Sequence, residues 1–240
     1  MSPVQQPAIR NRLLAALPRE DLGRLARHLR PATLDAGTLL HEPGQRIETV
    51  YFPETGMISM LARLEGGDVL EVGVVGREGM AGLPVVLGVD TALTEAMIQI
   101  AGTVLSLRAT LLKEQMEQSG ALRSLLLRYA HAEHAQVAQT AACNGRHTVE
   151  ERLARWLLMA HDRAGGDDLA LTQEFLSQML GVRRAGVTVA AGILQKAGLI
   201  DYAHGRITIR DRAGLEAASC ECYRAVATLS DRLLGPNHRG

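Results

Sequence analysis

The sequence predicts an α+β protein with an N-terminal antiparallel β-roll, a long helix and a C-terminal helix–turn–helix that carries a β-wing. Three observations predict this fold. Glycines separate short β-prone runs between residues 31 and 107. Residues 111–143 contain no proline and a single glycine, Gly120, which is typical of a long helix. After residue 171, a glycine separates two short amphipathic segments, and two more β-prone runs follow.

The composition is that of a folded protein. Of the 240 residues, 47% are hydrophobic and 22% are charged, which excludes a disordered chain. No apolar run is long enough for a membrane span, and the first residues have neither the basic start nor the apolar stretch of a secretory signal. Three cysteines are too few for a disulfide scaffold. We therefore expect a soluble, cytoplasmic protein without a membrane partner.

The first half of the chain begins with a predicted helix over 11–29 that is broken at Pro18. Strands are then expected at 38–40, 49–52, 57–61, 69–75 and 96–107. Gly66, Gly67 and Asp68 form a plausible hairpin turn between two of them. Strands of this length, with turn signals between them, indicate a small antiparallel barrel or roll.

Residues 111–143 carry a heptad stripe. One register contains Leu122, Tyr129, Gln136 and Cys143, and the other contains Leu125, Ala132 and Gln139. Such a stripe is typical of a two-stranded coiled coil, so we predict a homodimer. The predicted dimer interface consists of Leu122, Leu125, Tyr129, Ala132 and Gln136. The alternative is that the stripe packs on the chain's own barrel.

The helix is expected to stop where Asn144 and Gly145 break the pattern, and a domain boundary is expected there. Thr148 then caps a new helix that ends at Gly165. Thr172 caps the next, and Gly181 supplies the turn before a helix that starts at about Arg183. Strands at 199–202 and 206–209 follow.

This last segment has the features of a DNA-binding element. Between residues 175 and 210 it holds five cations, two of them Arg183 and Arg184 at the start of the second helix, against Asp201 alone. Arginine at that position reads guanine or clamps phosphate in the major groove. The predicted contacts to double-stranded DNA are Thr172, Arg183, Arg184, Thr188, Lys196, His204 and Arg206. The alternative is a basic, solvated helix pair.

Over residues 12–212 the chain resembles the Crp/Fnr family of transcription regulators. The resemblance rests on the runs 37–40, 50–52, 75–82 and 171–209, together with Gly44 and Gly56. It implies a cyclic-nucleotide-binding-like jelly roll as sensor domain (1–110), a dimerisation helix and hinge (111–147) and a winged helix-turn-helix DNA-binding domain (148–240). It also implies an inverted-repeat operator and RNA polymerase as a further partner.

The sensor departs from the members that bind cyclic AMP. Glu78 lies at their Gly-Glu motif, but residues 78–107 contain no lysine, arginine or histidine to pair with a phosphate. We therefore expect no bound cyclic nucleotide and no cofactor. A pocket for another ligand is expected to use Glu78, Val85, Val86, Met97 and Ile100, although the apolar ones equally suit the core of the roll.

No nucleophile–base pair, carboxylate pair or metal triad is recognisable, so we predict that the protein is not an enzyme. Cys220 and Cys222 lie two apart on an expected helix and would point to different sides, so no metal site is predicted. Cys143 is expected to be an inert packing residue, with a redox contact to its symmetry mate as the alternative. The second function considered is a ligand-sensing barrel protein with a degenerate DNA-binding domain.

Overall fold

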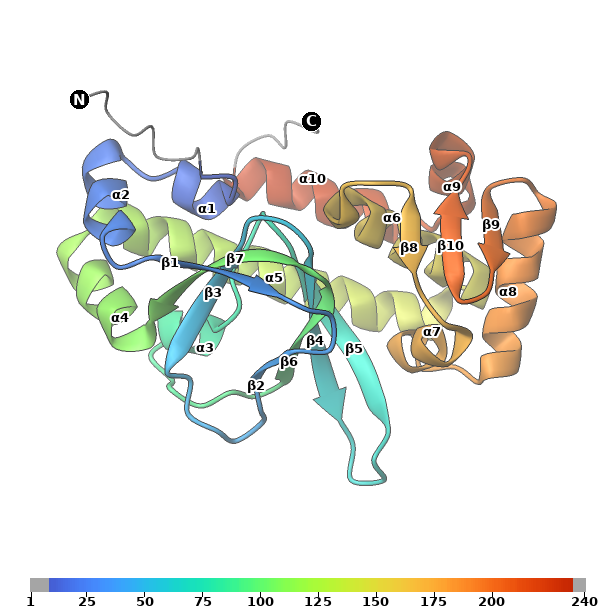
Figure 1. The fold of residues 1–240 in the computed structure, drawn as a ribbon, viewed down its shortest axis with the longest axis horizontal. Coiled ribbons are helices and arrows are strands. Elements are labelled where there is room, and N and C mark those ends of the chain that lie inside the picture. Colours follow the sequence, from blue (N-terminus) through green and yellow to red (C-terminus); the bar gives the residue numbers. More distant parts are fainter. Residues whose placement is uncertain (1–8, 235–240) are drawn as a thin grey trace.

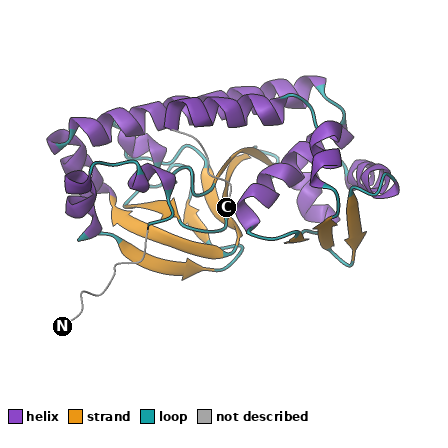
Figure 2. Cartoon of the chain, turned by 90° about the horizontal axis from the view of Figure 1, so that it is seen from above, coloured by secondary structure: helices purple, strands orange, loops and turns teal. Residues whose placement is uncertain are grey.

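The computed structural model describes residues 9–234 and confirms the α+β architecture: a β-roll, a long helix and a C-terminal helical domain (Figure 1). Residues 1–8 and 235–240, the ends of the expected first and third domains, lie outside the described residues. The long helix runs along the roll and reaches the C-terminal domain, as the view from above shows (Figure 2). Within residues 9–234, no helix combines the length and the apolar character that crossing a membrane requires.

Two short helices, α1 (Arg12–Ala15) and α2 (Arg19–Ala26), precede the roll and are separated at Pro18, as predicted. The Asn11 side chain caps α1 by accepting a hydrogen bond from the Leu14 amide. Leucines of both helices are buried together with apolar side chains of the long helix. The two helices therefore cover apolar surface at one end of the roll.

The roll consists of two antiparallel sheets with the strand orders β1-β7-β3 and β2-β6-β4-β5. Its strands are β1 (Arg30–Leu34), β2 (Leu39–His41), β3 (Thr49–Pro53), β4 (Met57–Arg63), β5 (Val69–Val75), β6 (Glu95–Ile100) and β7 (Gly102–Arg108). Apolar side chains from both sheets, among them Ile58, Ile98 and Val104, meet in one buried cluster. The short helix α3 (Leu83–Val86) lies between β5 and β6 in the chain. The predicted hairpin turn at Gly66 and Gly67 joins β4 and β5.

The region predicted as one helix over 111–143 is two helices, α4 (Ala109–Gln118) and α5 (Gly120–Arg146). Ser119 separates them in an extended conformation, and its hydroxyl caps α5 by accepting a hydrogen bond from the Leu122 amide at 3.0 Å. The end of α5 falls inside the predicted break at 144–147, but Asn144 and Gly145 do not stop the helix, which continues through both and ends at Arg146. Their low helix propensity costs only about 1 kcal/mol per residue, which the burial of Cys143 in the last turn offsets.

The predicted dimer stripe lies inside the chain and not on its surface. Its members Leu122, Leu125, Tyr129, Ala132 and Gln136 are all buried. The two polar ones bond to the roll: Tyr129 Oη donates to the Met80 carbonyl and Gln136 Nε2 to the Val74 carbonyl, both at 2.9 Å. The assignment of these five residues to a dimer interface is therefore corrected, and the alternative, packing on the chain's own roll, is what the structure contains.

The C-terminal domain begins with α6 (Val149–Ala164), which starts with a capping box formed by Thr148 and Glu151. Its other elements are β8 (Asp168–Ala170), α7 (Gln173–Leu180), α8 (Arg184–Lys196), β9 (Ile200–Ala203), β10 (Arg206–Ile209), α9 (Arg212–Ala218) and α10 (Cys222–Leu234). One buried cluster contains α6–α8 side chains together with Met57, Leu61 and Val74 of the roll. The roll and the C-terminal domain thus share a core.

Candidate nucleic-acid interface

The helix–turn–helix consists of α7 and α8. Thr172 caps α7, because its hydroxyl accepts a hydrogen bond from the Phe175 amide at 3.1 Å. Gly181 ends α7 with a φ of +61°, and a Cβ at this position would come within 2.6 Å of Leu70 on the roll. The positive φ favours glycine, and a larger residue would also have to displace the Leu70 side chain. Arg183 is the N-cap residue of α8, so the second helix starts at Arg184, where the sequence predicts it.

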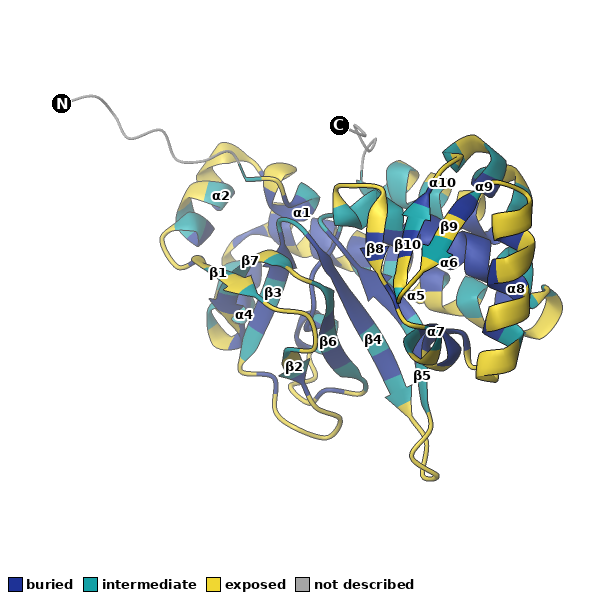
Figure 3. Cartoon of the chain, turned by 45° about the vertical axis from the view of Figure 1, so that its right-hand side comes forward, coloured by how far each residue is buried: buried dark blue, intermediate teal, exposed yellow. Residues whose placement is uncertain are grey.

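The inner face of α8 is buried as predicted, through Val187, Ala190, Ala191 and Leu194. The outer face is exposed over its length (Figure 3). It carries Arg184, Thr188 and Lys196, together with Val189 and Ile193, which are 60% and 47% exposed. The sequence analysis did not select these two apolar residues. Their spacing of four residues, which places both on one face of the helix, was the available signal.

Gln173 holds the start of this outer face in place. Its Oε1 accepts hydrogen bonds from Thr188 Oγ1 at 3.1 Å and from Arg184 Nε at 3.3 Å. The guanidinium of Arg184 keeps its terminal nitrogens for another partner. Gln173 was not among the predicted residues, since a first-turn glutamine has no special meaning until the neighbouring helix is placed.

The wing is a hairpin of β9 and β10, and β8 adds a third strand that the sequence analysis missed. His204 and Gly205 form its turn with φ values of +51° and +75°, as expected for a two-residue hairpin. Both His204 and Arg206 are exposed. Arg210 pairs with Asp201 at 2.6 Å, so the charge of Arg210 is partly offset.

The structure brings most of the predicted DNA contacts to one surface. The wing turn lies beside the start of α7, because the Leu171 amide donates to the Gly205 carbonyl at 2.8 Å. Gln173 then links α7 to Arg184 and Thr188. Lys196 lies at the other end of α8, away from this continuous surface.

The predicted ligand pocket does not form. Val85 and Val86 belong to the buried cluster with α4 and α5, whereas Met97 and Ile100 pack against the cluster shared with the C-terminal domain. Glu78 lines a cavity between the roll and the helices α5, α6 and α10, apart from the other four residues, and its Oε1 accepts hydrogen bonds from Arg163 of α6 and from the Gly76 amide, each at 3.0 Å. These five residues are therefore corrected from ligand contacts to packing and domain-docking residues.

Two carboxyls, the buried Glu71 and the half-buried Glu78, join the roll to α6. Burial alone would raise the pKa of Glu78, but the Arg163 guanidinium outweighs burial and holds this pKa below its ordinary value. Glu71 of β5 accepts hydrogen bonds from Ser59 Oγ at 2.6 Å and from Trp156 Nε1 of α6 at 2.7 Å. Burial raises the pKa of Glu71 to about 7. Neither contact could be predicted from local sequence, because each joins residues 85 positions apart.

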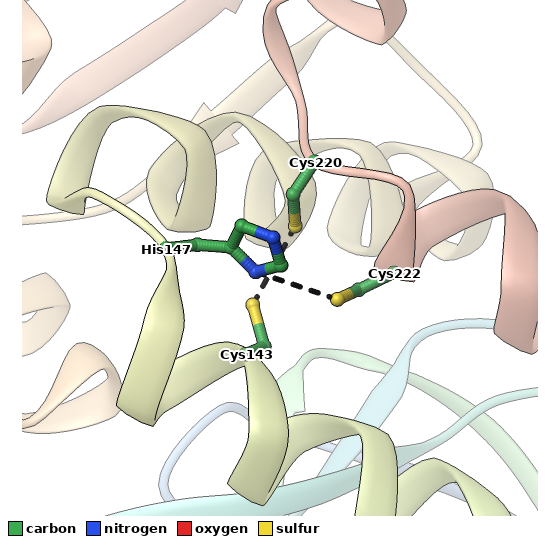
Figure 4. Close-up of side chains that lie close together, drawn as sticks. All are labelled: Cys143, His147, Cys220 and Cys222. Carbon is green, nitrogen blue, oxygen red and sulfur yellow. Dashed lines mark hydrogen bonds between the residues drawn. The ribbon is translucent and has the colours of Figure 1, made fainter.

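The three cysteines lie together with His147 at the junction of α5, α6 and α10 (Figure 4). Cys143 Sγ lies 3.5 Å from Cys220 Sγ, and Cys222 Sγ lies 3.6 Å from His147 Nδ1. The prediction that Cys220 and Cys222 point apart is wrong, because Cys220 precedes α10 and is not part of the helix. Cys143 faces this cluster inside the chain and not a symmetry mate.

Comparison with known proteins finds a family-model match in the C-terminal domain and solved structures with a similar fold. The family model of the Crp-like helix-turn-helix domain matches residues 151–218. No curated protein sequence matches the chain. FixK2 from Bradyrhizobium japonicum is similar over 80% of this chain and 98% of its own, with 19% identity and a TM-score of 0.68.

Two further solved structures show the same likeness. A CRP-family transcriptional regulator from Thermus thermophilus, TTHB099, has 19% identity and a TM-score of 0.64, over 78% of this chain and 96% of its own. The c-di-GMP-responsive global regulator CLP from Xanthomonas campestris has 17% identity and a TM-score of 0.61, over 80% and 99%. At these identities the likeness shows a common fold.

Proposed function

We propose that this chain is a transcription regulator of the Crp/Fnr family that binds a specific inverted-repeat DNA sequence as a homodimer. The Crp-like helix-turn-helix model over residues 151–218 and the fold shared with solved regulators support this proposal. In this proposal residues 1–110 form the sensor domain, 111–147 the dimerisation helix and hinge, and 148–240 the DNA-binding domain. RNA polymerase is the partner through which the bound dimer acts on transcription.

The exposed outer face of α8 carries the proposal. A helix with one buried and one exposed side fits the major groove, where its N-terminal residues reach base edges. Arg184, positioned by Gln173, donates to guanine, and the apolar side chains of Val189 and Ile193 suit contact with thymine methyl groups. Arg183 and Arg184 are exposed, so their side chains are accessible to DNA. This favours a functional DNA-binding domain over a degenerate one.

Phosphate contacts come from the residues around this face. Arg206 and His204 on the wing, Thr172 at the start of α7, and Arg183 and Lys196 at the two ends of α8 are all exposed. Such contacts fix the register of a protein on the duplex and carry no sequence information.

The dimer in this proposal uses the other side of α5. Ser124, Leu127, His131, His134, Ala138 and Ala141 are exposed and recur at alternating spacings of three and four residues. Leu127, 47% exposed, is the large apolar side chain of this stripe and would be buried by a second copy. Two copies packed along this stripe would place their recognition helices for two half-sites about one helical turn apart, roughly 34 Å.

The sensor signal is proposed not to be cyclic AMP or cyclic GMP. Residues 78–107 lack a cation, and Glu78 already pairs with Arg163. A buried cyclic phosphate would therefore have no counter-charge from this segment, at a cost that disfavours binding. Calorimetry is expected to detect no micromolar binding of either nucleotide, and such binding would refute this part of the proposal.

The DNA contacts are tested by separating base readout from phosphate binding. Arg184→Ala is expected to cost about 1–3 kcal/mol at one position of the half-site and to relax selectivity there. Arg206→Ala is expected to weaken binding to specific and non-specific DNA alike, and to reduce the salt slope by about one. Binding selections at two salt concentrations distinguish the two roles. The assignment is wrong if Arg184→Ala leaves the selected sequence unchanged while Arg206→Ala alters it.

A further inference from the structure

We propose that Cys143, His147, Cys220 and Cys222 bind one zinc ion, which joins the end of α5 to the start of α10. The four residues come from two parts of the chain that are more than 70 positions apart. The site is separate from the DNA-binding surface and does not depend on the proposed function.

The donor atoms have the spacing of ligands that share one ion. The three sulfurs and the imidazole nitrogen all lie within 4.8 Å of one another. With zinc–sulfur bonds of about 2.3 Å, two thiolates of a tetrahedral site lie roughly 3.8 Å apart. The observed Cys143–Cys220 separation of 3.5 Å and Cys222–His147 separation of 3.6 Å are close to that value. The four ligands of an iron–sulfur cluster are divided among two or four iron atoms, so they do not all converge on one point.

The backbone presents all four side chains to one point. Cys143 and His147 are four residues apart, so they lie on the same side of the last turn of α5. Cys220 lies in the link between α9 and α10, and Cys222 is the first residue of α10. All three cysteines are buried. Packing alone would explain buried thiols, but it does not require a histidine beside them.

The surrounding groups orient the ligands as in a built metal site. The Nε2 atom of His147 lies 3.2 Å from the Glu221 carboxylate, which leaves Nδ1 directed at the sulfurs. A histidine that binds metal characteristically donates its other ring N–H to such a carboxylate. Gln139 Nε2 donates a hydrogen bond to Cys222 Sγ at 3.0 Å, and a thiolate is a better acceptor than a thiol.

The local charge favours an anionic centre. Three thiolates and one Zn²⁺ carry a net charge of about −1. Arg152 and Arg155 are buried, and each interacts electrostatically with Cys143. The Nε atoms of both have no hydrogen-bond partner. Arg155 also donates to Thr140 and lies near Glu71, and Arg152 donates to the Leu180 carbonyl, but a zinc–thiolate centre would add a negative charge beside both guanidinium groups.

Metal analysis of the full-length, untagged protein tests the site. We expect one zinc per chain by mass spectrometry of the metals, and loss of most of it in Cys220→Ser, Cys222→Ser and His147→Ala. His28→Ala, which changes an exposed histidine far from the cluster, is the matched control and is expected to keep the zinc. Thiol-specific reagent is expected to react with the native protein only after a strong chelator removes the ion.

A spectrum of the wild-type protein decides the case even where the variants fail to fold. Refolding with Co²⁺ in place of zinc is expected to give the thiolate-to-cobalt charge-transfer band and the intense visible bands of a tetrahedral site. The proposal is overturned by a pale, octahedral cobalt spectrum. It is also overturned by wild-type protein that stays metal-free after zinc is supplied, by iron with inorganic sulfide, or by a Cys143–Cys220 disulfide.

Discussion

Replacing Glu71 with glutamine is expected to make the protein more stable above neutral pH. The Glu71 carboxyl is buried between the roll and α6, and both of its oxygens accept hydrogen bonds, one from Ser59 and one from Trp156. Burial raises its pKa to about 7, although these hydrogen bonds and the charges of Arg155 and Arg163 act in the opposite direction. The folded protein therefore favours the neutral acid.

The size and the pH range of the effect follow from this pKa. In the unfolded chain the glutamate ionises near its ordinary pKa of 4.5. A rise from 4.5 to about 7 corresponds to about 3 kcal/mol. The pKa of Glu71 is higher in the folded than in the unfolded protein, so the protonated carboxyl stabilises the folded state. This stabilisation is fully present below about pH 4.5, is lost as pH rises to about 7, and stays lost above that. Glutamine keeps the acceptor for Trp156 and does not titrate.

Urea unfolding of both proteins, followed by circular dichroism, measures the difference. The free energies of unfolding of wild type and Glu71→Gln are expected to be similar near pH 4.5 and to differ by about 3 kcal/mol near pH 8, with the variant more stable. Glu65→Gln, at the exposed hairpin turn, is the control and is expected to show no such dependence. A difference that does not change with pH, or a less stable variant at pH 8, would show that the Glu71 carboxyl is not neutral in the folded protein.

Three further predictions concern the turn, the domain junction and the dimer. Gly181→Ala is expected to lower the unfolding free energy by about 1–3 kcal/mol, because alanine is strained at the positive φ and its Cβ meets Leu70. Thermal unfolding measures this loss, and an unchanged Tm would contradict the prediction. Arg163→Gln leaves Glu78 without its cation, so the contact between the roll and α6 is expected to weaken by about 2–5 kcal/mol. Limited proteolysis of the variant is therefore expected to be faster than that of the wild type. An unchanged rate of proteolysis would argue against this docking role. Leu127→Glu with Ala138→Glu is expected to give folded monomers in light scattering, while retained dimers would place the interface elsewhere.

Local signals predicted the C-terminal half well. Gly181 requires a left-handed turn, Thr172 supplies a cap, and the two residues His204 and Gly205 form a hairpin turn; each depends on neighbours in sequence. The same holds for the helix break at Pro18 and the hairpin at Gly66 and Gly67. Where a residue type restricts its own backbone, the sequence alone is enough.

The failures arise where distant segments decide the outcome. The stripe from Leu122 to Gln136 has the period of a coiled coil, but a roll face that accepts hydrogen bonds from Tyr129 and Gln136 satisfies the same period. An amphipathic period therefore shows that a face is buried and not what buries it. The second, exposed stripe on α5 is poorer in large apolar residues, and periodicity did not reveal it.

The cysteine cluster was missed for a related reason. Its ligands follow the pattern Cys-x3-His and Cys-x-Cys, but these two halves are meaningful only when α10 lies against α5. In addition, the helix was expected to stop at Asn144, so His147 was not expected to lie one turn after Cys143 at the end of α5. The pairing of Glu78 with Arg163 was hidden in the same way, since no short-range signal links them.

The central claim is that the outer face of α8 reads a specific DNA sequence from each subunit of a dimer. Selection of double-stranded oligonucleotides from a random pool by the full-length protein tests it most directly. We expect an enriched inverted repeat with half-site centres about one helical turn apart, and loss of this enrichment for Arg184→Ala. A pool that remains random after repeated rounds, at a salt concentration where non-specific binding is suppressed, would show that α8 does not read a specific sequence.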